Sequence, residues 1–316
     1  MSRILAVGSV AYDSIETPFG KRTEILAGSA TYFALAARHF AKVSVVAAVG
    51  DDFRKEDLDV LASRGIDVSG VESKAGRTFR WAAKYTDDLR GRTTLSTELG
   101  VFADFKPRVP PSQSAFPYLF LGNIDPDLQR GVHAGMERPS LVVCDTMNFW
   151  IEGRREALDR TLKVIDLLVI NDEEAMLLSG EGNLARAAGA ILKMGPKALV
   201  VKRGEHGAAV FGKGYLLFVP ALILDGVVDP TGAGDTFAGG LVGCLAALGL
   251  GGRSALDETS MRLAVSAGTA LASFTVQGFG VESLVGAAPA AIAERHAQLQ
   301  KLAGWSGMKL PLGESA

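Results

Sequence analysis

The chain has 316 residues, 48% of them hydrophobic, and a formal net charge of −2 at pH 7. This length and apolar content suffice for the core of one large α/β domain. The near-zero charge, together with the lack of a basic stretch with interleaved aromatic residues, argues against nucleic acid as a partner.

The cysteine pattern and the hydropathy favour a cytoplasmic location. Cys144 and Cys244 both lie in apolar runs, as expected for buried thiols in a reducing compartment rather than for a disulfide framework. No run of about 18 apolar residues is present, so we expect no membrane partner. The N-terminus enters a short strand-like run and does not resemble a signal peptide.

The first part of the chain predicts alternating strands and helices. Residues 4–7 form an apolar run that ends at Gly8, which suits a central strand ending at the binding edge of a sheet. A helix is expected after it, then a strand over residues 43–49 and a second helix, which is the order of a β-α-β-α progression. Asp13 follows the first strand. Its position is explained equally by a turn and by hydrogen bonds from substrate hydroxyls.

The pattern changes over residues 78–97. Two β-prone stretches with alternating side-chain character flank a turn at residues 87–91, which predicts a hairpin inserted into the α/β chain. Arg77, Arg80 and Trp81 are candidates to reach a bound substrate. Alternatively, the aromatic residues of a half-exposed sheet pair with each other or with another subunit, so a homodimer through this sheet stays open.

The second half predicts further strands that end in polar residues. We expect strands over 118–121, 141–144, 166–170 and 198–201, a helix over about 153–164, and later helices over 261–274 and 290–302. Asn123 follows the first of these strands, at the kind of edge where open α/β sheets bind ligands. Asn171 follows the third and is explained by a helix N-cap with acidic residues after it. The tail from residue 304 is expected to be mobile.

Residues 207–214 nearly match a phosphate-binding P-loop, but we interpret them as a hairpin. Gly214 stands where a P-loop carries the hydroxyl residue that binds Mg²⁺, and a strand-like run follows where a helix is required. No G-x-G-x-x-G follows the first strand, which argues against a Rossmann dehydrogenase.

The stretch D-P-T-G-A-G-D-T-F-A-G-G, residues 229–240, carries the clearest chemical signal. It predicts an extended run, a glycine turn and a helix that starts near Gly234. The backbone N–H groups of residues 232–234 would form an anion cradle. Asp235 lies at its lip, where the helix dipole should keep it ionised, and it could orient a hydroxyl for phosphoryl transfer. A glycine C-cap followed by an aspartate N-cap is the alternative.

This stretch resembles D-T-x-G-A-G-D, the signature of the PfkB (ribokinase-like) family of carbohydrate and nucleoside kinases, with Pro230 as the second residue. The resemblance runs in the family's order over residues 4–302. It implies an α/β fold, a ribokinase-like three-layer sandwich with a mostly parallel central sheet and a small β-sheet lid. The whole chain, 1–316, would be one kinase domain, with the lid formed by about 11–25 and 76–106. The implied activity is ATP-dependent phosphotransfer to a hydroxyl of a small sugar or polyol.

The resemblance and the chemistry of the side chains together define an expected site. Asp235 would be the catalytic base, with an anion hole made by Gly232, Ala233 and Gly234. The acceptor would be bound by Asp13, Gly28, Tyr32, Arg77 and Asn123. ATP and Mg²⁺ would be bound by Asn171, Glu174 (to Mg²⁺ through water), Lys202, Gly204, Gly207, Ala267, Gly278 and Gly280. The residues that match a K⁺ site in some relatives are Asp229 and Thr231.

Several alternatives stay open. Tyr32 stands where the family's second signature, G-G-x-x-x-N, has asparagine, so it either contacts substrate or belongs to the core. The small residues around Ala267 would let the flat base of a nucleotide lie against their helix, but helix packing explains them nearly as well. A nucleoside kinase of the same family is one rival function. The other is a silent ligand-binding or regulatory relative, against which the presence of Asp235 and Glu174 counts.

Overall fold

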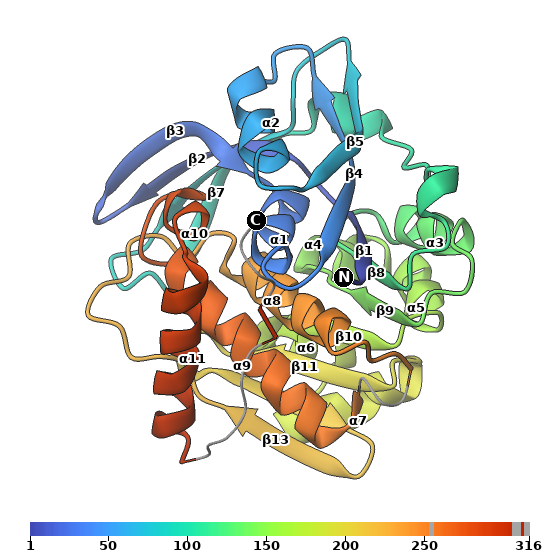
Figure 1. Ribbon diagram of the computed structural model, residues 1–316, viewed down its shortest axis with the longest axis vertical. Helices are drawn as coiled ribbons and strands as arrows, with labels where there is room; N and C mark the ends of the chain where they lie inside the picture. Colours follow the sequence, from blue (N-terminus) through green and yellow to red (C-terminus); the bar gives the residue numbers. More distant parts are fainter. Residues whose placement is uncertain (253–255, 305–310, 313–316) are drawn as a thin grey trace.

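The centre of the fold is a large, mostly parallel sheet (Figure 1). A computed structural model describes residues 1–252, 256–304 and 311–312, and within them this sheet has the order β13-β12-β11-β10-β9-β8-β1-β4-β5. Its strands are β1 (Arg3–Val7), β4 (Lys42–Gly50), β5 (Asp67–Lys74), β8 (Tyr118–Leu121), β9 (Leu141–Cys144), β10 (Leu167–Asn171), β11 (Ala198–Lys202), β12 (Ala208–Gly212) and β13 (Tyr215–Val219). Only the hairpin β12–β13 at one edge runs antiparallel to its neighbours.

Helices cover both faces of this sheet, which explains why its central strands are continuous apolar runs. One face packs against α1 (Ser29–Ala37), α8 (Ala233–Ala247), α9 (Glu258–Thr275) and α11 (Pro289–Leu302). The other packs against α3 (Pro126–Ala134), α5 (Arg155–Leu162), α6 (Asp172–Ser179) and α7 (Leu184–Met194). The short helices are α2 (Lys55–Ala62), α4 (Asn148–Gly153) and α10 (Glu282–Val285). The expected three-layer α/β sandwich is confirmed.

A second, separate sheet has the order β3-β2-β6-β7 (Figure 1). It consists of β2 (Ala11–Thr17), β3 (Gly20–Ala27), β6 (Arg80–Tyr85) and β7 (Arg92–Glu98). The predicted hairpin is β6–β7, and it joins the chain's first hairpin through a parallel pairing that sets Asp13 beside Trp81. A small cluster of Ile15, Ala83, Tyr85 and Phe279 packs this sheet against the C-terminal part of the chain.

Some expected elements differ in the structure. The helix predicted over about 153–164 is present as α5, but a further short helix that was not predicted, α4, precedes it, and the two meet at Arg154. Strand β5 was not predicted, because it is only partly buried at the edge of the sheet and has no apolar run. The expected hairpin at β12–β13 is present, so the P-loop match is accidental. Most of the tail, at 305–310 and 313–316, lies outside the described residues.

Candidate active site

The N-terminus of α8 forms the centre of the candidate site. Gly232 is its N-cap and has the left-handed backbone that favours glycine, with φ of 75°. A Cβ atom at Gly232 would lie 2.4 Å from the ring of Tyr32, and one at Gly234 would lie 2.9 Å from Nζ of Lys202. Glycine is therefore required at position 232, whereas at Gly234 the end of the Lys202 side chain would have to move. The helix starts at Ala233, whose N–H donates to Pro230 O at 3.2 Å, so among the described residues of the predicted cradle it is Gly234 that keeps an unpaired N–H at the helix end.

Four charged side chains from four elements gather beside this helix end. Lys202 Nζ lies 3.7 Å from Oδ1 of Asp145, which follows β9. Burial alone would lower the pKa of Lys202, but the carboxylates of Asp145, Glu174 and Asp235 outweigh it, and the pKa is raised. Lys202 therefore stays a cation and shares its charge among three acids.

The pKa of Asp235 is raised to about 7, which contradicts the expectation that the helix dipole keeps it fully ionised. Burial is the largest cause, and the charge of Asp145 adds to it, while Lys202 acts in the opposite direction. The helix dipole is worth at most about 2 kcal/mol in a partly buried setting. Desolvation beside other acids exceeds it here. A carboxyl group that titrates near neutral pH is suited to accept a proton.

Asn171 and Glu174 form a capping box at the start of α6. Asn171 Oδ1 accepts a hydrogen bond from the backbone N–H of Glu174 at 2.8 Å, and Glu174 Oε2 accepts one from the backbone N–H of Asn171 at 2.8 Å. The N-cap interpretation is thus confirmed. Glu174 is also buried, and burial together with the charge of Asp145 raises its pKa to about 7. Its other carboxyl oxygen, Oε1, takes no part in the capping box.

A second group of buried side chains, from the small sheet and from α1, lies within reach of Asp235. Asp13 on β2 is 7% exposed, and burial, followed by the charges of Asp229 and Asp235, raises its pKa to about 8. Tyr32 is buried too, and its hydroxyl has no hydrogen-bond partner among the described residues. Its ring is thus unavailable for stacking on a ligand.

Two contacts connect the small sheet to the main body across the site. Tyr85 Oη and Thr231 Oγ1 are 3.0 Å apart. Arg90, in the turn between β6 and β7, forms an ion pair of 2.7 Å with Glu205. Glu205 belongs to the short 3₁₀ helix Gly204–His206 that follows β11, where the nucleotide-binding turn was predicted. The small sheet therefore reaches both the predicted acceptor side and the predicted nucleotide side.

The loop residues around the acceptor side are tightly constrained. Gly28 has φ of 105°, and a Cβ atom there would lie 2.4 Å from the carbonyl oxygen of Ser9. Asn123, which follows β8, accepts a hydrogen bond of 2.8 Å from Trp150 Nε1 on α4. The oxygen Oδ2 of Asp229 is buried and has no hydrogen-bond partner within 3.5 Å among the described residues, whereas Oδ1 accepts from the Thr231 N–H at 2.9 Å.

Other residues predicted for the site contact neighbours outside this group of charged side chains. Arg77 is exposed and forms an ion pair of 3.0 Å with Glu98. Ala267 is completely buried where α8 and α9 meet, so the helix-packing interpretation holds and its side chain has no surface to offer a base. Close neighbours also leave no room for a side chain at the remaining glycines. A Cβ atom at Gly207 would lie 2.1 Å from Val219 O, and one at Gly278 would lie 2.3 Å from Ser283 Oγ. A Cβ atom at Gly280 would lie 3.0 Å from Ile25 Cδ1.

Sequence reasoning did not select Asp145 or Tyr85 for the site. Asp145 could have been found, because it follows a buried strand in the same way as Asn123 does. Tyr85 had no such signal, since its role depends on where the small sheet meets Thr231. Among the described residues, no group of three or more His, Cys, Asp or Glu side chains is arranged to hold a metal ion. No described helix is both long and apolar enough to span a membrane.

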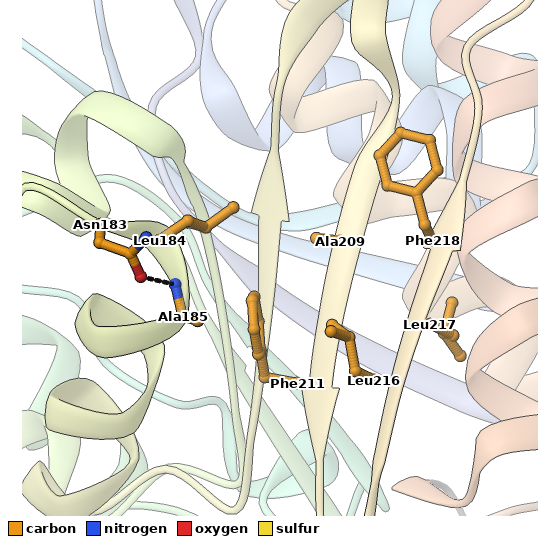
Figure 2. Close-up of a pocket in the computed structure, with 8 residues that line it drawn as sticks. All are labelled: Asn183, Leu184, Ala185, Ala209, Phe211, Leu216, Leu217 and Phe218. Carbon is orange, nitrogen blue, oxygen red and sulfur yellow. Dashed lines mark hydrogen bonds between the residues drawn. The ribbon is translucent and has the colours of Figure 1, made fainter.

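A pocket elsewhere in the structure contains none of these residues. Figure 2 shows it on the β12–β13 hairpin, beside the start of α7. Its volume is about 400 Å³. Its lining is almost entirely apolar, and its polar side chain, Asn183, is engaged in capping α7. With no titratable group, this pocket lacks the means for acid–base chemistry, so the candidate site remains at the N-terminus of α8.

Comparisons with known proteins agree with this geometry. The sequence matches the family described as pfkB family carbohydrate kinase over residues 128–286. It is 30% identical over 248 residues to a cytidine kinase of Thermococcus kodakarensis, which covers 77% of this chain and 88% of that enzyme. It is also 30% identical over 249 residues to a 2-dehydro-3-deoxygluconokinase of Thermoproteus tenax, covering 73% and 76%.

A solved structure has the same fold. The nucleoside kinase of Methanocaldococcus jannaschii, an archaeal member of the ribokinase family, matches with a TM-score of 0.75 at 20% identity, over 94% of this chain and 99% of that one. The shared fold, the family match and the two relatives lead to one conclusion: this chain belongs to the pfkB family of carbohydrate kinases, whose activity is phosphotransfer to a small sugar or nucleoside.

Proposed function

We propose that the protein transfers the terminal phosphoryl group of ATP to a hydroxyl of a small sugar, polyol or nucleoside, with Asp235 as the base. The observation that carries this proposal is the position of Asp235 in the first turn of α8, with Lys202 Nζ against Gly234. Donors aimed at one spot stabilise the charge of a phosphoryl group in transfer. A carboxyl group with a pKa of about 7 takes the proton that the acceptor hydroxyl releases.

The nucleotide and its metal ion belong on the Lys202 side of this centre. Lys202 would contact a phosphate, and the turn at Gly204 would lie along the nucleotide. A divalent ion such as Mg²⁺ keeps most of its waters and is held largely by nucleotide phosphates. Glu174, whose buried carboxyl group lies within reach of the charges of Lys202 and Asp145, fits the role of orienting those waters. The buried, unpartnered Oδ2 of Asp229 fits a K⁺ ion.

The acceptor belongs on the Asp13 side. Burial and nearby acids raise the pKa of the Asp13 carboxyl group to about 8, and hydrogen bonds donated by vicinal hydroxyls of a bound sugar or polyol would favour its charged form. A nucleoside is the second candidate. The edge-to-face pair of Phe149 and Trp150, which contacts Asn123, offers partly exposed aromatic surface at this end, and a cytidine kinase is among the similar proteins.

We further propose that the whole chain is one kinase domain and that the small sheet acts as its lid. The Tyr85–Thr231 and Arg90–Glu205 contacts support closure over both substrates. Closure would exclude water and so protect ATP from hydrolysis. A cytoplasmic location is part of the same proposal, since ATP is its substrate.

An acceptor screen tests the function. The full chain would be incubated with ATP and Mg²⁺ and with cytidine, ribose, fructose or 2-dehydro-3-deoxygluconate in turn, and ADP would be measured against a control without acceptor. We expect ADP formation to depend on one acceptor and the product to gain one phosphoryl group by mass spectrometry. Binding of an acceptor without any ADP formation would instead favour the silent regulatory relative.

A further inference from the structure

Asn123 and Trp150 form a hydrogen bond whose direction is fixed by chemistry. An indole N–H is a donor only, so the side-chain atom of Asn123 that lies 2.8 Å from Trp150 Nε1 must be its oxygen. The usual ambiguity between the oxygen and the nitrogen of an amide is therefore removed. The NH₂ group of Asn123 points elsewhere, and it has no hydrogen-bond partner among the described residues.

Asn123 lies near residues that are expected to bind the acceptor. Asn123 follows β8, and the adjoining Gly122 is held so close to α1 that a Cβ atom on it would lie 3.1 Å from Ser29 Oγ. Ser29 itself follows Gly28, the residue expected to contact the acceptor. Asn123 is partly exposed, so a ligand in this region can reach its NH₂ group.

Trp150 makes a second contact besides the one with Asn123. Its ring packs edge to face against Phe149, with centroids 4.8 Å apart and planes at 79°. The indole N–H occupies the oxygen of Asn123 and so disfavours turning that oxygen toward a ligand. An amide without this partner could present either its donor or its acceptor.

We propose that Asn123 selects acceptors whose non-reacting end carries a carbonyl or carboxylate oxygen, and that Trp150 is the positioning residue that enforces this choice. The inference rests on the proposed function, since it names the acceptor class of the same site. Two sources supply this chemistry: the ring carbonyl of a pyrimidine nucleoside and the carboxylate of a sugar acid. An end that carries only donors, such as an ammonium group, would face the NH₂ group of Asn123 without a partner and would be rejected.

Binding measurements on two matched pairs test the proposal without requiring turnover. Calorimetry on the full chain would compare cytidine with 1-β-D-ribofuranosylbenzene, whose ring has no carbonyl. It would also compare 2-dehydro-3-deoxygluconate with 3-deoxyfructose, in which a hydroxymethyl group replaces the carboxylate. We expect one oxygen-bearing member to bind at least about tenfold more tightly than its partner. The pair that shows this preference identifies the source.

Variants then separate a positioning role from a merely structural one. Asn123→Asp keeps an oxygen for the Trp150 N–H but removes the NH₂ group, so the preference should disappear or reverse. Trp150→Phe should weaken the preference several-fold, and it should add nothing in an Asn123→Ala background, because Trp150 acts only through Asn123. Thermal melting would confirm that each variant is folded.

The outcomes distinguish this inference from the proposed function. A wild type that binds both members of each pair equally, or binds none of the four compounds, overturns the inference, as does an Asn123→Asp variant with an unchanged preference. An intact preference without ADP formation would instead overturn the proposed kinase function and leave the selection by Asn123 standing.

Discussion

Lys202 Nζ lies 3.7 Å from Oδ1 of Asp145 on one side and is packed against the backbone of Gly234 on the other. The lysine therefore connects the carboxyl end of β9 to the N-terminus of α8, and it lies beside the predicted anion cradle. Because acidic side chains hold this cation in place, it is positioned to bind a phosphate before any nucleotide binds.

We therefore expect Lys202→Ala to raise the KM for ATP by about tenfold or more, since charge-assisted hydrogen bonds are worth roughly 1.5–3 kcal/mol. Lys213→Ala is the matched control, because Lys213 is an exposed lysine in the turn between β12 and β13. Steady-state kinetics with varied ATP would measure both variants. A larger effect from Lys213 would show that the wrong lysine has been assigned to the nucleotide.

Asp235→Asn should lower turnover by at least about a hundredfold, the usual size of a general-base contribution, while ATP still binds. The amide keeps the shape of the carboxyl group but cannot take the acceptor's proton. ADP formation and calorimetric ATP binding would be measured on the same preparation. Near-normal ADP formation with an identified acceptor would contradict the role of Asp235 as the base.

The pH dependence of kcat/KM provides an independent check on the same residue. The base acts only when unprotonated, so kcat/KM for the acceptor should rise about tenfold per pH unit below the pKa of about 7 and level off above it. Because the cation of Lys202 lowers the pKa of Asp235, Lys202→Ala should move this limb to higher pH. If kcat/KM levels off near pH 4, or if its pH dependence is the same in the variant, another group is titrating.

The sequence was informative wherever function depends on one short stretch, and less so where distant segments meet. Both central features of residues 229–240, the glycine turn and the helix that carries Asp235, could be predicted because they are local. The ionisation of Asp235 could not, since it depends on burial and on Asp145, which is 90 residues away (235 − 145). Likewise, the burial of Tyr32 depends on how α1 packs against Gly232, and the bond between Asn123 and Trp150 depends on how α4 folds back.

The small residues of α9 form a local pattern that has two possible explanations. Their pattern was compatible with a nucleotide base lying against the helix and with close helix packing. Gly240 and Gly268 are in fact used where α8 and α9 touch, since a Cβ atom at Gly268 would lie 2.5 Å from Phe237 O and one at Gly240 would lie 2.8 Å from Cα of Gly268. Spacing alone cannot separate these two uses, because both require small side chains on one helix face.

Asp13 should make the folded protein less stable as the pH rises. Its pKa is about 8 in the folded state against an ordinary value of 3.8, so between these values the folded state binds more protons than the unfolded state. The stabilisation is complete below about pH 4 and is lost as the pH rises through about 8. Asp13→Asn does not titrate, so its Tm should match that of the wild type at low pH and exceed it by about 2 °C or more at pH 8.5.

Calorimetric melting across this pH range would measure the difference, with Asp104→Asn as the control because Asp104 is exposed in the same chain. Two melting curves that stay parallel from acid to alkaline pH would contradict the burial of an ionisable Asp13.

The last prediction concerns Asp13 and recognition of the acceptor. The carboxyl group lies on β2 beside Trp81 and within reach of the charge of Asp235, so an acceptor bound for reaction with Asp235 must pass close to it. Asp13→Ala should lower kcat/KM for the true acceptor by about two orders of magnitude, from the loss of charge-assisted hydrogen bonds of roughly 1.5–3 kcal/mol each, while the KM for ATP changes little. An acceptor analogue that lacks one of two paired hydroxyls should react poorly with the wild type but lose little further activity with the variant. Both changes delete the same contact, so their effects should not add. If the two losses are additive, Asp13 does not touch those hydroxyls and serves only in the small sheet.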